Sequence, residues 1–207
     1  MLIYANSTNT DLKREIMILF INACVRDDSR TKRIADFLLK HLNDEIKEVN
    51  LEKENIIPLN SKTLDLRTKL IENQNFDDPI FNYAKDFAKA DTIAIAAPFW
   101  DLSFPSSLKC YIEAINIIGL TFAYSPEGIP YGLCKAKSLY YVTTAGGPIF
   151  NTEFGFGYIK SLCSNFYGIK DIYCIKAENL DIIGSDVENI LKKTEEQILS
   201  QQIIAAT

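Results

Sequence analysis

The sequence has 207 residues with only five cysteines, one histidine and no long apolar run. An odd number of cysteines without a CxxC pair fits neither a disulfide framework nor a zinc or iron–sulfur site. His41 ends an expected surface helix and has no neighbour in the sequence that would complete a catalytic triad or a metal site, so histidine-based hydrolysis is nearly excluded. No apolar segment approaches the roughly 20 residues that a membrane span needs.

Positive charge is also scarce, because 22 Lys and Arg stand against 27 Asp and Glu and give a net charge of −5. Nucleic acid is therefore not expected as a partner, since binding it requires a basic surface. Residues 1–15 lack the apolar centre of a signal peptide, so we expect a cytoplasmic location. We interpret this segment as a disordered extension or a misplaced start, because Met17 stands where a shorter chain would begin, and residues 16–207 as one domain.

Short apolar runs alternate with amphipathic stretches along the chain. The expected strands are Ile16–Ala23, Ile46–Leu51, Thr92–Ala97, Ser138–Thr144 and Asp171–Ile175. The expected helices are Thr31–Leu42, Pro79–Ala90, Pro105–Ile118, Phe154–Tyr167 and Asp186–Ser200. This alternation predicts an α/β fold, a parallel sheet with helices on both faces. Glu52–Asp78 does not fit the pattern, because it is long and polar, and we expect a lid, a binding loop or a disordered segment there.

In a parallel α/β sheet, ligands bind at the carboxyl ends of the strands. The loop after the first strand holds Arg26, Ser29, Arg30 and Thr31 and leads directly into a helix. A helix start has unpaired N–H groups that hold phosphate, and these side chains add hydroxyl donors and positive charge. The alternative is plain helix capping by Asp28 or Ser29.

Two further loops follow strands at the same edge. Pro98, Phe99, Trp100 and Asp101 come after the third strand, where aromatic side chains lie along a flat heteroaromatic ring or, alternatively, cap the core. After the fourth strand come Thr144, Gly146 and Gly147. Paired glycines let a backbone approach a ligand closely, although they also occur in ordinary turns. The shared position of the three loops predicts one ligand site.

Residues 97–147 carry a set of motifs in a recognisable order. They are Ala97-Pro98-Phe99-Trp100, then Leu108, Lys109, Tyr111, Ile112 and Glu113, then Gly119-Leu120-Thr121-Phe122 with Tyr124, then Glu127-Gly128, and finally Thr144, Gly146 and Gly147. This set resembles the family of FMN-dependent NAD(P)H:quinone oxidoreductases and azoreductases, which are flavodoxin-like enzymes. The resemblance covers about half of the chain and extends more loosely to Ser29, Thr31 and the segment Tyr158–Gly168.

The resemblance implies a flavodoxin-like three-layer sandwich with strand order 2-1-3-4-5. It implies FMN with its phosphate at Ser29–Thr31 and its isoalloxazine between Pro98–Asp101 and the Thr144–Gly147 loop. It also implies a homodimer in which Tyr124 and Phe166 border the face where nicotinamide and acceptor take turns. The family often has an amide where this chain has Asp101, so only a backbone contact is expected there.

The function expected from this resemblance is two-electron, ping-pong hydride transfer from NADH or NADPH, through FMN, to quinones, azo compounds or similar flat acceptors. Two alternatives remain open from the sequence. One is a flavodoxin-type one-electron carrier, and the other is a non-redox binding module that has lost FMN. The aromatic residues of the pocket and the apolar helix Pro105–Ile118, which suits a dimer interface, favour the enzyme.

Overall fold

The structure, a computed structural model, describes residues 17–200 and is built around a parallel sheet of five strands. The strands are β1 (Met17–Asn22), β2 (Glu45–Asn50), β3 (Thr92–Ala96), β6 (Ser138–Thr144) and β7 (Asp171–Ala177). Their order across the sheet is β2-β1-β3-β6-β7. Counted within this sheet alone, that is the 2-1-3-4-5 order, so the expected fold class is confirmed.

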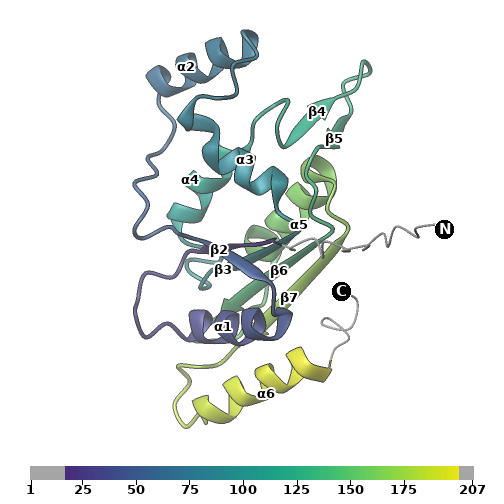
Figure 1. The fold of residues 1–207 in the computed structure, drawn as a ribbon. Coiled ribbons are helices and arrows are strands. Elements are labelled where there is room, and N and C mark those ends of the chain that lie inside the picture. Colours follow the sequence, from purple (N-terminus) through teal and green to yellow (C-terminus); the bar gives the residue numbers. More distant parts are fainter. Residues whose placement is uncertain (1–16, 201–207) are drawn as a thin grey trace, which may run out of the picture.

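Helices cover both faces of the sheet and make the outer two layers (Figure 1). α1 (Arg30–Leu42) and α6 (Val187–Ser200) lie side by side on one face. α3 (Asn82–Lys89), α4 (Ser106–Ile115) and α5 (Tyr158–Leu162) lie on the other. Covering both faces explains why the strands read as continuous apolar runs rather than as alternating ones.

The core consists of two clusters, one on each side of the sheet. In β1, Ile18 and Phe20 pack toward α1 and α6, whereas Leu19 and Ile21 pack toward α3, α4 and α5. These alternating directions follow from the two-residue period of a strand. The sheet is thereby fixed from both sides, and the loops at its carboxyl edge start from rigid strand ends.

The segment Glu52–Asp78 differs from the expectation of a lid, a binding loop or disorder. It contains α2 (Ser61–Glu72), which begins at a capping box formed by Asn60 and Thr63. No residue of α2 is buried, and Arg67 ties the helix to α4 by donating to the carbonyl oxygens of Glu113 and Asn116. The helix projects from the top of the view in Figure 1.

Two other elements differ from the expected pattern. β4 (Phe122–Tyr124) and β5 (Pro130–Gly132) form an antiparallel hairpin that the sequence did not indicate. The helix expected over 154–167 is α5 flanked by two π-helical turns, Glu153–Gly157 and Cys163–Tyr167. The helix expected from Pro79 begins with a 3₁₀ turn, Pro79–Phe81, before α3.

Among residues 17–200, no helix combines the length and the apolar character needed to cross a lipid bilayer. The expected N-terminal extension, residues 1–15, lies outside the described residues and stays a prediction.

Candidate functional site

The loops that follow β1, β3 and β6 meet at one polar pocket of about 340 Å³. The loop after β7 completes the wall. The lining residues are Val25, Arg26, Asp28, Ser29, Arg30, Thr31, Pro98, Phe99, Trp100, Thr144, Ala145, Gly146 and Asp181. The pocket therefore unites all of the expected cofactor-binding residues except Asp101 and Gly147.

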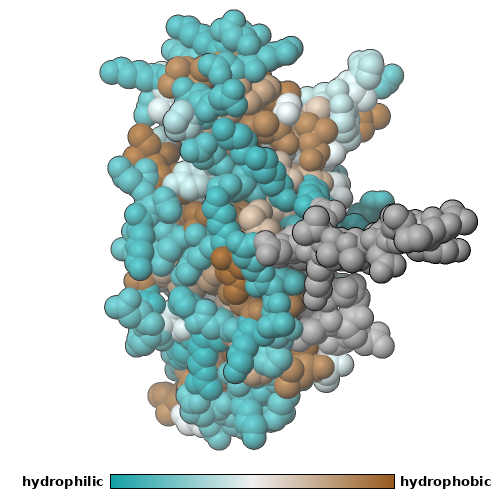
Figure 2. All heavy atoms as spheres, in the orientation of Figure 1, coloured by the Kyte–Doolittle hydropathy of each residue, from teal (hydrophilic) through white to brown (hydrophobic). Residues whose placement is uncertain are grey.

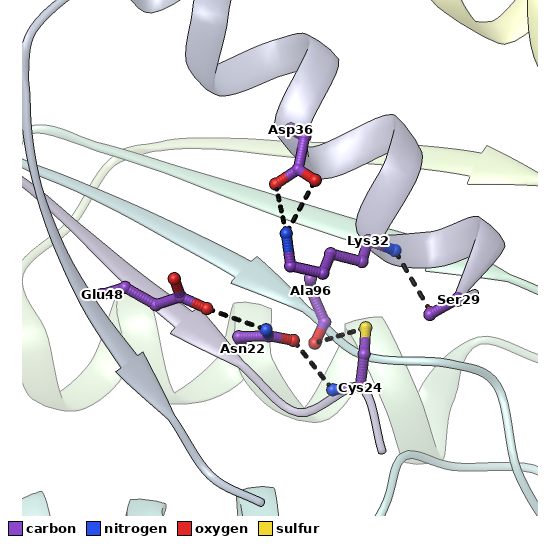
Figure 3. Close-up of polar contacts among 7 residues, drawn as sticks. All are labelled: Asn22, Cys24, Ser29, Lys32, Asp36, Glu48 and Ala96. Carbon is purple, nitrogen blue, oxygen red and sulfur yellow. Dashed lines mark hydrogen bonds and ion pairs between the residues drawn. The ribbon is translucent and has the colours of Figure 1, made fainter. Parts of the chain in front are cut away.

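A buried amide fixes the beginning of the β1–α1 loop (Figure 3). Oδ1 of Asn22 accepts a hydrogen bond from the backbone N–H of Cys24 at 3.0 Å, and Nδ2 of Asn22 donates to Glu48 on β2 at 2.9 Å. The Asn22 side chain is 1% exposed, so leaving these groups unpaired would be costly. This arrangement sets the direction in which the loop leaves the sheet.

Cys24 lies in the same loop but faces the interior. Its thiol contacts the carbonyl oxygen of Ala96 at 3.8 Å. Burial raises the pKa of the Cys24 thiol, against a smaller opposing effect of the Ser29 hydroxyl. A thiol held in its protonated form is a poor nucleophile, so Cys24 contributes packing rather than chemistry.

The start of α1 presents its backbone to the pocket. Ser29 is the N-cap, and its hydroxyl accepts from the N–H of Lys32 at 3.3 Å, so Ser29 rather than Asp28 caps the helix. The N–H groups of Arg30 and Thr31 come in the first turn, where an α-helix offers them no acceptor of its own. The hydroxyls of Thr31 and Thr144 lie 2.7 Å apart in a buried contact that joins α1 to the end of β6.

The two arginines of the pocket have different surroundings. Arg30 donates to the carbonyl oxygen of Leu180 at 3.0 Å and to Asp181 at 2.8 Å. Arg26 forms no ion pair with any residue between 17 and 200. Arg26 is thus the arginine whose charge remains for an anionic ligand, whereas Arg30 binds the β7–α6 loop.

The β3–α4 loop places aromatic rings against the pocket. The N–H of Phe99 donates to the carbonyl oxygen of Thr144, and this bond joins the loop to β6. Trp100 and Ser103 then exchange two backbone hydrogen bonds around a tight turn, in which Asp101 and Leu102 have φ values of 49° and 65°. Asp101 sits at the tip of this turn and does not line the pocket, while Trp100 lines it and is 40% exposed.

The β6 loop is packed closely against the β7–α6 loop. A Cβ added at Gly146 would lie 2.2 Å from Oδ2 of Asp181, whereas one at Gly147 would meet no atom within 4 Å. A side chain at position 146 would therefore have to displace the Asp181 carboxylate. The carbonyl oxygens of Ala145, Gly146 and Gly147 accept backbone N–H groups from the stretch 179–181.

Tyr124 and Phe166, expected beside the substrate, do not line this pocket. Phe166 stacks on Phe122 with ring centroids 4.6 Å apart, and Tyr124 contacts the same ring at 5.6 Å. Their location is the β4–β5 hairpin and the turn packed against it. In Figure 1 this hairpin and the β1–α1 loop stand on opposite sides of the molecule.

The sequence reasoning missed Asp181, which is the most informative of the unexpected lining residues. It follows β7, whose carboxyl end lies beside that of β6, so the rule that ligands bind at strand ends applied to it as well. The loop after β7 has no glycine pair or aromatic residue before Asp181 that would mark it as a binding loop.

A family model described as flavodoxin-like fold matches residues 17–201. The chain is 38% identical to FMN-dependent NADH:quinone oxidoreductase 2 of Clostridium acetobutylicum, with 89% of this chain and 96% of the relative covered. It is 36% identical to the FMN-dependent NADH:quinone oxidoreductase of Clostridium beijerinckii, with 86% and 93% covered.

Solved structures share the fold. The azoreductase of Bacillus anthracis strain Sterne superposes with a TM-score of 0.80 at 22% identity, over 93% of this chain and all (100%) of that one. The FMN-dependent NADH-azoreductase of Bacillus anthracis strain Ames Ancestor, solved in complex with FMN, superposes with a TM-score of 0.74 at 22% identity, over 89% and 98%.

Proposed function

The chain belongs to the flavodoxin-like fold family and to the family of the FMN-dependent NADH:quinone oxidoreductases, and on that premise we propose that it oxidises NADH and passes two electrons, in ping-pong fashion, to quinones, azo compounds or similar flat acceptors. One observation carries this proposal: three loops that are far apart in the sequence form a single pocket at the carboxyl edge of the sheet. That edge is where parallel α/β sheets bind their ligands.

The groups that line the pocket fit the phosphate of FMN. We assign the phosphate to the N–H groups at the start of α1, with the Ser29 and Thr31 hydroxyls beside them. The positive end of the helix macrodipole favours an anion there. Arg26, which has no ion-pair partner within residues 17–200, supplies the compensating charge.

The remaining walls fit the flat ring system. Pro98, Phe99 and Trp100 offer apolar surface on one side, and the backbone of Gly146 offers an N–H donor on the other. When bound, FMN supplies the ring that accepts and donates a hydride. The chain holds the reacting rings in contact, excludes water with its aromatic side chains and directs N–H dipoles at developing negative charge.

We also propose a homodimer. The hairpin exposes several apolar side chains, namely Tyr124, Ile129, Tyr131 and Leu133. Exposed apolar groups that gather on one element favour a protein interface. In such a dimer Tyr124 and Phe166 of the partner subunit would border the acceptor, which accounts for their distance from the pocket of their own chain. The cytoplasmic location stays a prediction.

The test of this function is spectroscopic. Purified protein is expected to carry the absorbance of oxidised flavin and to lose it when NADH is added without oxygen. Apoprotein that takes up no FMN on reconstitution would exclude the proposal and favour a non-redox binding module.

A second measurement separates the enzyme from a one-electron carrier. Steady consumption of NADH with a soluble quinone, with parallel lines in double-reciprocal plots, is expected of the ping-pong enzyme. A chain that binds FMN but turns over only with a protein partner would be a carrier of the flavodoxin type.

A further inference from the structure

The stretch 179–181, at the start of the β7–α6 loop, binds three successive carbonyl oxygens of the β6 loop. The N–H of Leu180 donates to Ala145 at 3.1 Å, and the N–H of Asp181 donates to Gly146 at 2.9 Å. The N–H of Asn179 donates to Gly147 at 3.3 Å. These bonds turn the carbonyl groups of the β6 loop toward the β7–α6 loop.

The N–H groups of the same peptides therefore point away from the β7–α6 loop. In a trans peptide the C=O and the N–H point in opposite directions, and the described chain contains no cis peptide. The carbonyl groups of Ala145 and Gly146 face the stretch 179–181, so the N–H groups of Gly146 and Gly147 face away from it. Of these two residues Gly146 lines the pocket, so its N–H group is the one placed to meet a partial negative charge there.

Side chains hold the stretch 179–181 in place. Arg30 binds both the carbonyl oxygen of Leu180 and the carboxylate of Asp181, so the start of α1 is joined to the β7–α6 loop. The same carboxylate fills the space beside Gly146. Asn179 adopts a left-handed backbone with φ of 66°, a conformation that asparagine tolerates better than most residues. Arg30, the packing beside Gly146 and the backbone conformation of Asn179 therefore all hold the stretch in place.

We propose that Asp181 is a positioning residue of the flavin site, because its contacts with Arg30 and Gly146 keep the N–H group of Gly146, which lines the pocket, aimed at the flavin edge that becomes negative on reduction. This inference rests on the proposed function and adds a wall to the site that the three expected loops do not include. Donors aimed at developing charge stabilise the reduced cofactor more than the oxidised one. Asp181 thereby controls both FMN affinity and reduction potential.

Glu188 provides a matched control. It pairs with Arg33 at 2.8 Å and so joins α1 to α6, at similar exposure to the Arg30–Asp181 pair. Arg33 also pairs with Glu195 at 3.4 Å, just as Arg30 also binds the carbonyl oxygen of Leu180. Glu188 lies outside the pocket lining. A change at Glu188 removes a comparable tie without touching the β6 loop.

The experiment compares Asp181→Ala, Asp181→Asn and Glu188→Ala with the wild type. Apoprotein is titrated with FMN by fluorescence quenching, and the two-electron potential of the reconstituted protein is measured by equilibration with dyes. Both changes at Asp181 remove the charge, but asparagine keeps an acceptor for Arg30. The difference between alanine and asparagine therefore isolates positioning from charge.

We expect Asp181→Ala to bind FMN about tenfold more weakly than Asp181→Asn and to have the more negative potential. Glu188→Ala should match the wild type in both. The inference would be overturned if the two Asp181 variants had equal FMN affinity and potential, or if Glu188→Ala shifted these quantities as much as Asp181→Ala. FMN binding by the wild type would still support the proposed function in that case. A wild type that bound no FMN would overturn both.

Discussion

The surroundings of the pocket and the β4–β5 hairpin differ in how many of their side chains find partners within the same chain. Beside the pocket, the side chains of Asn22, Thr31 and Arg30 each make a hydrogen bond within the chain. The hairpin instead leaves its apolar side chains open to solvent, Ile129 at 63% and Tyr131 at 50%. Figure 2 shows brown and pale atoms on this hairpin, which mark its less hydrophilic surface. The comparison teaches that polar groups beside the pocket find partners within one chain, whereas the hairpin carries the exposed apolar surface on which the proposed homodimer rests.

The largest expected effect comes from placing charge on the hairpin. Ile129→Glu together with Tyr131→Glu should raise the dimer dissociation constant by at least about a hundredfold, because unpaired carboxylates would be buried at an interface. Sedimentation velocity over a range of concentrations measures it. FMN affinity of the resulting monomer should change little, and a monomer that lost FMN as well would show that the pocket is not complete in one chain.

The next effect concerns the glycine that touches Asp181. Gly146→Ala should weaken FMN binding about tenfold, since the new methyl group would overlap the Asp181 carboxylate and displace it from Gly146 and Arg30. Gly147→Ala is the matched control, because its methyl group meets nothing within 4 Å. Fluorescence titration of both apoproteins with FMN measures the two affinities. An equal loss of affinity in the two variants would contradict the role given to the contact between Gly146 and Asp181.

Arg26 should contribute less than Gly146. Arg26→Gln removes a positive charge that has no ion-pair partner within residues 17–200 and should weaken FMN binding about threefold to tenfold, with most of the loss at low salt. Riboflavin, which lacks the phosphate, provides the comparison ligand. A loss of the same size for riboflavin would show that Arg26 does not act on the phosphate.

The buried hydroxyl pair should affect stability in addition to FMN binding, because Thr31 and Thr144 both line the pocket. Thr31→Val leaves the Thr144 hydroxyl without its partner and should cost about 1 to 2 kcal/mol of unfolding free energy in urea. The double change Thr31→Val with Thr144→Val should cost less than the sum of the single changes. Strict additivity would mean that the two hydroxyls do not depend on each other.

The smallest effect near neutral pH concerns thiols on the α3–α5 side of the sheet. Burial raises the pKa of Cys163 and of Cys134 to about 12, and burial likewise raises that of Cys174 to about 11, from 9.0. A raised folded-state pKa adds stability that is fully present below about pH 9 and is lost as pH rises toward 12. Melting temperature should therefore be flat from pH 7 to 9 and fall above it. Cys163→Ala should reduce the slope of that fall.

The sequence predicted the sheet and most of the pocket because both depend on local patterns. β6 matches its expected bounds, Ser138–Thr144, since a continuous apolar run reports a strand buried on both faces. The three loops that line the pocket followed from the strand ends. Asp181 could not be found in this way, because its role comes from contact with Gly146, and this contact exists only after β6 and β7 pair.

The elements that the sequence did not indicate share a physical cause. β4 and β5 have three residues each, too few to show a strand period. α2 buries no side chain, so it has little apolar periodicity, and Asn60 with Thr63 was its one local signal. Elements that are fixed by distant contacts or by capping leave only a weak trace in hydrophobic patterning.

The weak attachment of α2 has a consequence for local unfolding of the protein. The helix is held by the Arg67 hydrogen bonds to α4, while Leu70 and Ile71 only partly enter the core. A segment with so little buried surface opens at a lower free energy than the sheet and detaches without unfolding it. The α2 helix should therefore exchange its backbone amide hydrogens faster than the sheet, while Phe76, which contacts Phe81, keeps the end of the segment on the core.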